Sequence, residues 1–506
     1  MLVPARSDAA VAARTSRALR VASTSVEAWL LAGVIVVGAG LRFATLGAQS
    51  YWFDEAQAAH ELHLSLGAMF HSIFGVETNP PLYFVVGWVW VHVFGAGEVG
   101  LRSLSALAGT AVVVLAYLCG RELVSREAGL LAAALAALSP FMIWYSQEAR
   151  EYMLLAAMCG ASMLFWARAW HEPSRWNIVG WGTFSALALL THSFAVFLVV
   201  PEALWLLYVI RTRTIAIAVG LVAAVQVALL PIAFNHATSN LLGFISATPL
   251  NLRIQDVPVV FAIGTPYDGQ PTQYGLLGAA ALAALVIPLL VIGADSRQLR
   301  GAGASAALAG TVILIPLGLA LLGEDYFIQR ALIPAWLPLA VVVGTACTAR
   351  RARIAGGALA VVLLAGCVYI QVHIDGNHQY QRPDWRGVAT ALGSTPPGGR
   401  AIVAYDGQFA QDPLAIYLPG VAWTQTGSTT VNVGEIDVIG HAWQQVGKPL
   451  PGGVRLIGTK LVNDFLVARF AVAPARRLGR PQIAGEALSL LGPASGSGTV
   501  LLQRPG

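Results

Sequence analysis

The sequence predicts an all-α membrane protein that crosses the bilayer about eleven times and carries a C-terminal α/β domain. Composition is the first reason: of 506 residues, 56% are hydrophobic and only 11% are charged, whereas globular proteins carry about 25% charged residues. Long apolar runs that recur up to residue 373 are the second reason. The third is a change to more polar, strand-like sequence from residue 374 onward.

The apolar runs have the length and spacing of membrane spans. A helix needs roughly 20 predominantly apolar residues to cross the hydrocarbon core, and most runs reach this length with their flanks. The runs lie at 27–47, 81–96, 103–120, 128–145, 152–170, 177–191, 194–210, 215–233, 276–293, 304–322, 332–348 and 354–373.

Arginines between the runs predict the topology, because cytoplasmic connections are enriched in positive charge. These connections fall on one side only if one run before Arg121 does not span. The run 81–96 is short, follows Pro80 and is rich in Trp, Tyr and His, so we interpret it as a helix on the outer surface. The N-terminus is then cytoplasmic and the C-terminal domain extracytoplasmic. In the alternative, 81–96 spans and another short run does not.

Three regions follow from these patterns. Residues 1–25 are basic and rich in Ala and Ser, which is typical of a disordered cytoplasmic tail. We expect 26–373 to form the transmembrane domain, with the first run retained because no A-x-A-like cleavage site follows it. Residues 374–506 are long enough for a small α/β domain. Its strand-like runs are 401–404, 454–457, 465–470 and 500–502.

The remaining composition argues against several other classes of protein. The net charge of +5 and the pI near 9.1 do not indicate nucleic-acid binding, because the basic residues punctuate apolar runs. All four cysteines fall inside such runs, without the spacing of a metal or disulfide site. Neither a P-loop, nor an internal repeat, nor the paired broken helices of many transporters is evident.

One acidic pair stands directly after the first apolar run, in Tyr51-Trp52-Phe53-Asp54-Glu55. Aromatic residues favour the membrane–water interface. Carboxylates at this depth are hydrated or functional, because burying them in hydrocarbon costs several kcal/mol. The pair is compatible with a helix start, where acids stabilise the first turn, and with a general base.

Two outer connections carry arginines that the topology does not require. Arg150 lies in the turn Gln147 to Tyr152 between two runs, and Arg330 opens the run that follows Glu324-Asp325. Each is compatible with a hydrated turn or local ion pair, and each can also grip phosphate oxygens. His192, at the outer end of a run, is compatible with a structural role. Paired carboxylates and outer arginines together suit a base acting on an acceptor hydroxyl while cations hold a lipid-borne phosphate.

A set of motifs, in this order, resembles the GT-C membrane glycosyltransferases. The nearest branch looks like the bacterial glycosyltransferase 39 group, which is dolichyl-phosphate-mannose-protein mannosyltransferase-like and includes aminoarabinose transferases and lipid A galacturonosyl transferases. The resemblance covers residues 27–350 and is specific for the superfamily, not for the sugar. The motifs are Asp54-Glu55, Asn79-Pro80-Pro81-Leu82-Tyr83, Leu101-Arg102-Ser103, Tyr145 to Tyr152, and Arg330-Ala331-Leu332-Ile333-Pro334.

The resemblance implies roles for individual residues. Asp54 would be the catalytic base with Glu55 beside it, and Arg150, Arg330 and His192 would contact the donor phosphate. The site would be lined by Glu148, Tyr152, Tyr326, Asn79 and Arg102. No cofactor is assured. If a divalent cation binds, its ligands would be Asp54 and Glu148, although an arginine stands where metal-dependent relatives carry a further acid.

The expected function is inverting sugar transfer from a polyprenyl-phosphate donor to a lipid, glycan or protein acceptor outside the cytoplasmic membrane. A polymerase or ligase of lipid-linked glycans is the alternative within the same chemistry, and the outer loop 234–275 keeps it open. A secondary transporter or flippase is the alternative from another class. Against the latter, the charges gather at the outer boundary and not at the midplane.

Overall fold

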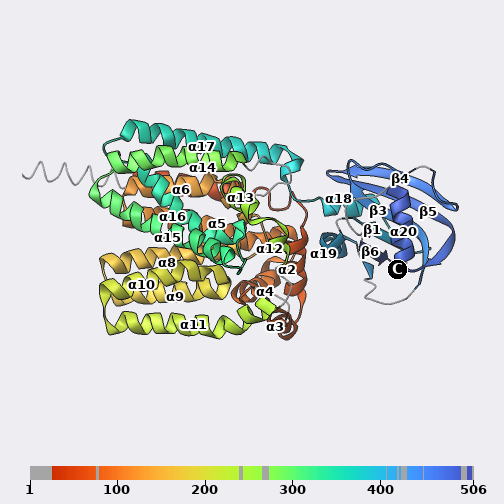
Figure 1. The fold of residues 1–506 in the computed structure, drawn as a ribbon, viewed down its shortest axis with the longest axis horizontal. Helices are drawn as coiled ribbons and strands as arrows, with labels where there is room; N and C mark the ends of the chain where they lie inside the picture. The colour runs from red at the N-terminus through yellow and green to blue at the C-terminus, as the bar shows by residue number, and fades with distance from the viewer. Residues whose placement is uncertain are drawn as a thin grey trace, which may run out of the picture. The chain divides into compact units, whose positions relative to one another are not determined.

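The chain divides into two compact units, each described here by itself (Figure 1). What we call the membrane unit comprises Met1–Thr45, Phe70–Gly87 and Arg102–Val372; the sheet unit comprises Leu46–Met69, Trp88–Leu101 and His373–Gly506. This computed structural model describes residues 26–75, 79–238, 243–264, 273–405, 407–418, 421–422, 430–447, 449–491 and 499–503. The predicted tail 1–25 lies outside them.

The multi-pass helical fold is confirmed. Within the described residues, nine helices are long and apolar enough to cross a membrane, and the bent pair α6 (Arg126–Leu138) and α7 (Pro140–Ser146) makes a tenth. Helix α9 (Arg175–Thr191) has 17 residues and is not among these candidate spans. The nine are Val26–Phe43, α5 (Glu98–Leu123), α8 (Tyr152–His171), η1 with α10 (Ser193–Ile210), α11 (Arg213–Ile232 of Arg213–Thr238), α14 with η3 (Tyr274–Gly293), α15 (Ser296–Leu321), η4 with α16 (Gln329–Cys347) and α17 (Arg353–Gly376).

The run predicted to lie on the outer surface forms α4 (Leu82–Phe94), a helix of 13 residues. A straight helix of that length is about 20 Å long, which is less than the ~30 Å of hydrocarbon in a bilayer. Helix α4 is therefore too short to span alone, and its surface position remains a prediction. The other short helices are α2 (Phe53–His63), α3 (Leu66–Gly75), α12 (Gly243–Ala247) and α13 (Leu250–Ile263). The last two belong to the predicted loop 234–275, of which 239–242 and 265–272 lie outside the described residues.

The sheet unit contains a six-stranded mixed sheet with the order β2-β6-β1-β3-β5-β4. Strands β1 and β3 are parallel, and the other pairs are antiparallel. The strands are β1 (Arg400–Ala404), β2 (Val421–Ala422), β3 (Val431–His441), β4 (Val454–Val462), β5 (Phe465–Leu478) and β6 (Thr499–Gln503). The four predicted strand-like runs are confirmed as parts of β1, β4, β5 and β6.

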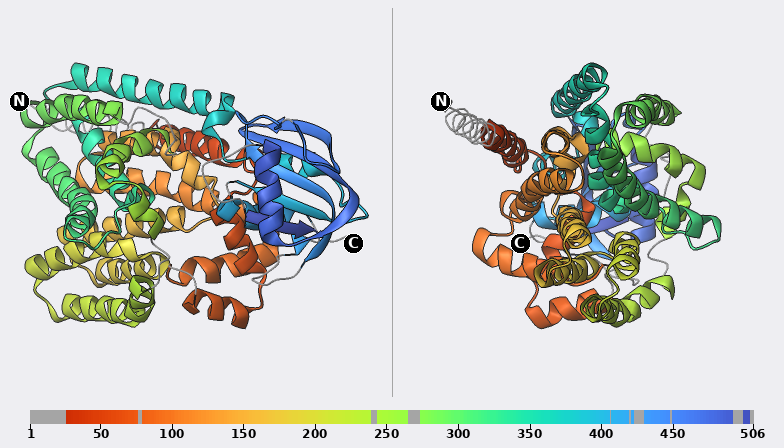
Figure 2. Two further views of the ribbon diagram at one scale, coloured as in Figure 1. Left: turned by 45° about the vertical axis from the view of Figure 1, so that its right-hand side comes forward. Right: turned by 90° about the vertical axis from the view of Figure 1, so that its left-hand side faces the viewer.

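Helices cover both faces of this sheet, which explains why every residue of β1 is buried. Successive side chains of a strand point to opposite faces. Ala401 and Val403 accordingly pack with α20 (Arg480–Leu491), which lies across the strands in Figure 2. Ile402 and Ala404 pack with α18 (Trp385–Leu392) and α19 (Gly407–Tyr417) on the other face.

A buried arginine joins the first spanning helix to the break between α6 and α7, whose axes differ by 58°. The carbonyl of Ala136 would accept from the residue four positions later, but that residue is Pro140 and has no N–H group. Arg42, 0% exposed, donates to this carbonyl at 2.6 Å, to that of Ala137 at 3.1 Å and to Ser146 Oγ at 3.0 Å. The break in the helix thus supplies the acceptors that a buried cation needs.

Helix α5 approaches this junction closely at Gly109. A Cβ atom there would overlap Ser146 Oγ and come within 3.0 Å of Arg42 Nε. We predict that Gly109→Ala destabilises the protein by about 1–3 kcal/mol, the usual cost of overpacking. The measurement is the thermal midpoint in detergent. Gly303→Ala on α15 is the control, since its Cβ would meet nothing within 4 Å among the described residues. A Gly109→Ala midpoint at or above that of the wild type would contradict the close packing.

Candidate functional site

The turn between α7 and α8 is polar and yet buried. Its polar side chains are at most 8% exposed, namely Gln147, Glu148, Arg150 and Glu151. Gln147 holds the turn against the end of the first span, since its Nε2 donates to the carbonyl of Leu41 at 3.0 Å and to Thr45 Oγ1 at 2.7 Å. The turn is therefore positioned by the same helix end that Arg42 anchors.

Glu151 connects the arginine of this turn to the segment before α4. Its Oε2 lies 3.1 Å from Arg150 Nε, and its Oε1 accepts from Asn79 Nδ2 at 2.9 Å. Both oxygens of a fully buried carboxylate are thus engaged, which offsets the cost of removing it from water. Ser105 Oγ on α5 also donates to the carbonyl of Arg150 at 3.3 Å. Arg150 is thus held through its side chain by Glu151 and through its backbone carbonyl by Ser105.

Arg330 and His192 meet at the ring of Tyr152. The guanidinium carbon of Arg330 lies 5.9 Å from the centre of this ring, and the centre of the His192 imidazole lies 6.2 Å from it. His192 Nδ1 accepts from the backbone N–H of Phe194 at 3.1 Å, so in this arrangement Nδ1 carries no proton. The imidazole is then neutral, with Nε2–H as a donor. His192 offers this site a hydrogen bond and not a charge.

The membrane unit thus brings together the predicted residues Asn79, Arg150, Tyr152, His192 and Arg330. We call these, with Glu151, the arginine cluster.

Three further predicted residues belong to the membrane unit. Glu148, which is 1% exposed, accepts through its backbone carbonyl from Arg150 N–H at 2.9 Å. Arg102, also 1% exposed, lies on α5 three positions before Ser105. The hydroxyl of Tyr326 instead donates to Glu324 at 3.3 Å, so the observed contact of that hydroxyl is local.

Sequence reasoning missed the residues that fix the loop before η4. Arg253 on α13 pairs with both oxygens of Asp325 and also donates to the carbonyl of Phe327. This hydrogen-bonded pair lowers the pKa of Asp325. Gln329, next to Arg330, donates to Asp256 on α13 at 3.2 Å. These contacts join segments about 70 residues apart in the chain. The sequence near the loop therefore does not indicate which residues pair.

In the sheet unit, the acidic pair divides into two different environments. Glu55 is 0% exposed. It lies in the first turn of α2, with Oε2 3.5 Å from the backbone nitrogen of Trp52 and 3.8 Å from Arg382 Nε. Asp54 is half-buried. Glu55 thus lies at a helix start, which was one of its predicted alternatives, and it also forms a buried ion pair.

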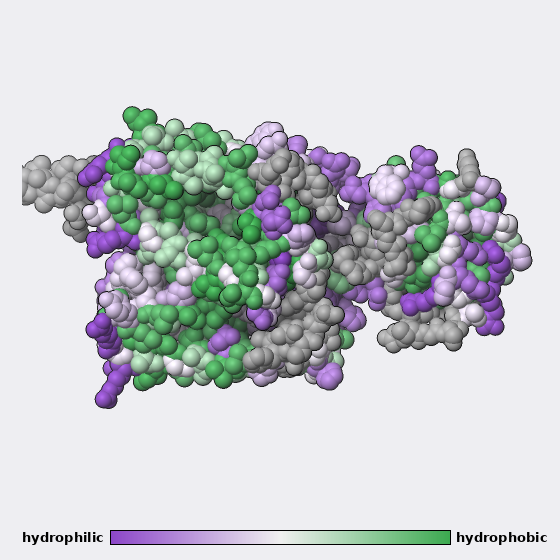
Figure 3. Space-filling model, in the orientation of Figure 1, coloured by the Kyte–Doolittle hydropathy of each residue, from purple (hydrophilic) through white to green (hydrophobic). Residues whose placement is uncertain are grey.

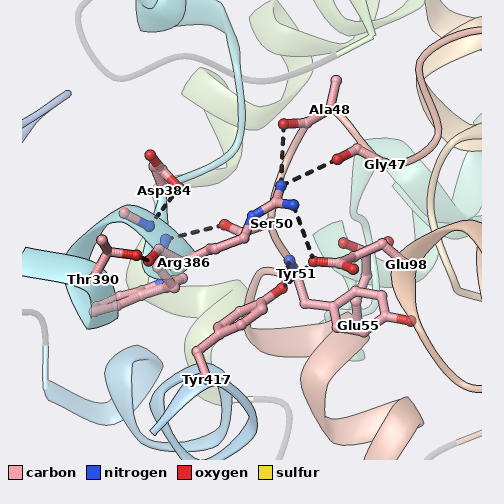
Figure 4. A network of polar contacts seen from close by, with 12 residues as sticks. Gly47, Ala48, Ser50, Tyr51, Glu55, Glu98, Asp384, Arg386, Thr390 and Tyr417 are labelled. Atoms are coloured by element: carbon pink, nitrogen blue, oxygen red, sulfur yellow. Dashed lines mark hydrogen bonds and ion pairs between the residues drawn. The ribbon is translucent and has the colours of Figure 1, made fainter. Parts of the chain in front are cut away.

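A network of hydrogen bonds fastens the start of α2 to the C-terminal part of the sheet unit (Figure 4). The hydroxyl of Tyr417 accepts from the backbone N–H of Tyr51 at 2.7 Å and donates to Glu98 at 2.7 Å. Arg386 donates to the carbonyls of Gly47 and Ala48 at 3.1 and 3.2 Å. Ser50 Oγ accepts from Trp385 N–H at 3.0 Å. The segment that carries Asp54 is thereby held by residues more than 300 positions later in the chain.

The residues present do not form a metal site in the described part of the chain. No group of three or more His, Cys, Asp or Glu side chains there is arranged to hold a metal ion. The candidate ligands Asp54 and Glu148 belong to different units. The acid nearest to Glu148 in sequence is Glu151, and Asn79 and Arg150 engage both of its oxygens. We assign no step to a metal.

A family model described as dolichyl-phosphate-mannose-protein mannosyltransferase matches residues 78–236. This range includes Asn79, the turn 147–152 and His192, and excludes Asp54 and Arg330. Among curated proteins, none matches the chain significantly.

Solved structures show the fold to which the chain is similar. ArnT from Cupriavidus metallidurans in the apo state matches with a TM-score of 0.52 and 13% identity, over 88% of this chain and 98% of that one. The archaeal oligosaccharyltransferase AglB from Archaeoglobus fulgidus has a TM-score of 0.43 and 13% identity, over 73% and 58%. The protein O-mannosyltransferase Pmt1–Pmt2 complex from S. cerevisiae has a TM-score of 0.33 and 18% identity, over 41% and 32%.

The likeness to ArnT concerns the fold. The chain thus has the multi-pass helical fold of ArnT, and its residues 78–236 match the family described as dolichyl-phosphate-mannose-protein mannosyltransferase.

Proposed function

We propose that the enzyme transfers a sugar, with inversion, from a polyprenyl-phosphate donor to an acceptor outside the cytoplasmic membrane. The arginine cluster is the observation that carries this proposal. It places the guanidinium of Arg330 over the ring of Tyr152, and the buried guanidinium of Arg150, two positions before Tyr152, beside Glu151. The matching family is described by a dolichyl-phosphate sugar, which is a donor of the proposed kind.

The cluster suits a phosphate that gains charge as its bond to the sugar breaks. Preorganised cations stabilise such a charge without reorganising during the reaction. Arg150 is fixed by Glu151, and Arg330 is held over Tyr152, where a cation interacts favourably with the ring face. His192 adds a neutral donor. We assign Arg150, Arg330 and His192 to the donor phosphate, with Tyr152 and Asn79 as positioning residues.

Asp54 is assigned as the general base. In the proposed step the acceptor oxygen forms a bond to the anomeric carbon, and the bond from that carbon to the phosphate oxygen breaks with its electron pair. The acceptor proton goes to Asp54. Glu55 is a positioning residue in this scheme, since its carboxylate faces Trp52 and Arg382. The acceptor is a lipid, glycan or protein, and the N-terminus lies in the cytoplasm.

The base assignment predicts different outcomes for the two acids. Asp54→Asn should keep the wild-type melting temperature and lose about 10²–10⁴-fold in turnover, the usual contribution of general base catalysis. Glu55→Gln should lower the melting temperature, because it removes the charge that faces buried Arg382. The assay uses purified protein with a panel of polyprenyl-phosphate sugars. Wild-type turnover by folded Asp54→Asn would overturn the assignment.

Arg150→Lys tests the phosphate role while keeping a positive charge beside Glu151. Lysine lacks the planar fork of arginine, so we expect the KM for the donor to rise about tenfold, or roughly 1.4 kcal/mol, while the KM for the acceptor stays unchanged. The matched control is Arg168→Lys, in the last turn of α8, the helix that follows Arg150. Equal changes in both KM values would indicate a structural role.

Tyr417→Phe tests whether the hydrogen bonds of Figure 4 position α2. The change removes two hydrogen bonds to Tyr417, each worth about 1 kcal/mol. We expect kcat to fall several-fold with the donor KM unchanged. Tyr405→Phe is the control, because the buried hydroxyl of Tyr405 makes no hydrogen bond among the described residues. An equal loss in both variants, or a change in donor KM alone, would contradict the positioning role.

A further inference from the structure

Two cavities lined by arginines lie at the ends of spanning helices in the membrane unit. The first basic pocket, of about 380 Å³, lies between the α5–α6 connection, the start of α15 and the α16–α17 connection. The second basic pocket, of about 500 Å³, lies between the ends of α5 and α8 and the start of α15. The arginines of the first are Arg121, Arg126, Arg297 and Arg350, and those of the second are Arg297 and Arg300.

The pockets are neighbours that share one arginine. Arg297 lines both. Residues 121 and 124–127 of the α5–α6 segment line the first pocket, whereas 122 and 123 line the second. Gly301 of α15 packs directly on the backbone of Leu123, where a Cβ atom would overlap the carbonyl oxygen. This close contact between α5 and α15 separates the two cavities, and Arg297 stands one turn before it.

Positive charge exceeds the acids that balance it. Arg350 pairs with Asp295 at 3.2 Å and Arg126 pairs with Glu27 at 2.9 Å. Among the described residues, Arg121, Arg297 and Arg300 have no carboxylate within ion-pair distance. The acid Glu122 of the second pocket lies 3.8 Å from His171. Each pocket therefore has a net capacity for an anion, with Arg297 in reach of both.

Exposed apolar side chains lie next to these arginines. Val291 and Ile292, shortly before the first turn of α15, are 68% and 72% exposed, and Leu299, between Arg297 and Arg300, is 41% exposed. Figure 3 shows the hydrophobic flank of the membrane unit bordered by hydrophilic side chains at its left-hand end. A cation next to an apolar surface at the end of a membrane helix matches a lipid, whose phosphate and acyl chains need both.

We propose that the two basic pockets together bind one diphosphatidyl lipid, with one phosphate in each pocket and Arg297 between them. Basic pockets at the ends of membrane helices are known sites for such headgroups. A lipid with two phosphates gains over one with a single phosphate because its second contact forms within the same molecule. The site lies at the end of the membrane unit that is predicted to be cytoplasmic. It is independent of the proposed sugar transfer.

The test uses delipidated full-length protein in detergent, with native mass spectrometry and the thermal midpoint as readouts. The probes are cardiolipin, phosphatidylglycerol at equal phosphate, phosphatidylcholine and inorganic phosphate. We expect cardiolipin to bind about tenfold more tightly than phosphatidylglycerol, and the other two probes to leave the midpoint unchanged. A free anion that acted as strongly as cardiolipin would overturn the lipid assignment, as would equal binding of phosphatidylcholine.

Three variants separate this site from general surface charge. Arg297→Gln should weaken cardiolipin binding by about fivefold or more, since each basic residue near a lipid surface contributes about 1 kcal/mol. Arg300 lines only the second pocket, so Arg300→Gln should lower the affinity for cardiolipin to that for phosphatidylglycerol. This variant also provides the test if Arg297→Gln fails to fold. Arg213→Gln is the control, an exposed arginine on α11 that lines neither pocket. An equal loss in Arg213→Gln, or no loss in Arg300→Gln, would overturn the proposal.

Discussion

The arrangement of the membrane unit depends on a buried cation that has no carboxylate among its observed hydrogen-bond partners. Arg42 is compensated by backbone carbonyls and a hydroxyl group. Such a group is costly to bury unless its donors are satisfied, and a regular helix has no spare carbonyls in its interior. Pro140 leaves the carbonyl of Ala136 without an intrahelical donor at the bend of 58° between α6 and α7. Arg42 uses this carbonyl as an acceptor, which offsets the cost of burying its charge. Without the proline, the buried guanidinium of Arg42 would lose this acceptor. Without Arg42, the carbonyl of Ala136 would lose its donor.

This junction extends to the arginine cluster through consecutive residues. Ser146 accepts a hydrogen bond from Arg42, and Gln147 donates one to the end of the first span. The ion pair of Arg150 and Glu151 follows a few residues later. Glu151 then accepts a hydrogen bond from Asn79, which precedes α4. The turn that carries Arg150 is therefore held by the first span, by the helix break and by the segment before α4. The proposed phosphate site is built on a turn that is fixed before a ligand arrives, which is the condition for electrostatic preorganisation.

Sequence reasoning succeeded where the signal was local and failed where it depended on pairing. The length of the apolar runs predicted the helices, since it is visible in consecutive residues. Strand β3 was missed because Gly434, Glu435 and Asp437 interrupt its apolar pattern; Asp437 is nonetheless fully buried, 3.3 Å from buried Arg400. Arg42 could have been singled out from the sequence, because a lone arginine inside an apolar run indicates a buried, partnered charge. The partner of Glu151 had none, because 72 residues separate it from Asn79.

The acidic pair at the start of α2 shows how neighbouring residues of one type acquire different roles. Adjacent positions on a helix point about 100° apart, so Asp54 and Glu55 cannot share one environment. Glu55 faces inward to Trp52 and Arg382 and is wholly buried, whereas Asp54 keeps partial exposure. A carboxylate already engaged with a buried arginine is a poor proton acceptor, because protonation would leave that arginine uncompensated. Asp54 is therefore the acid of this pair that suits the proposed role of base, and the buried ion pair of Glu55 holds the helix that presents it.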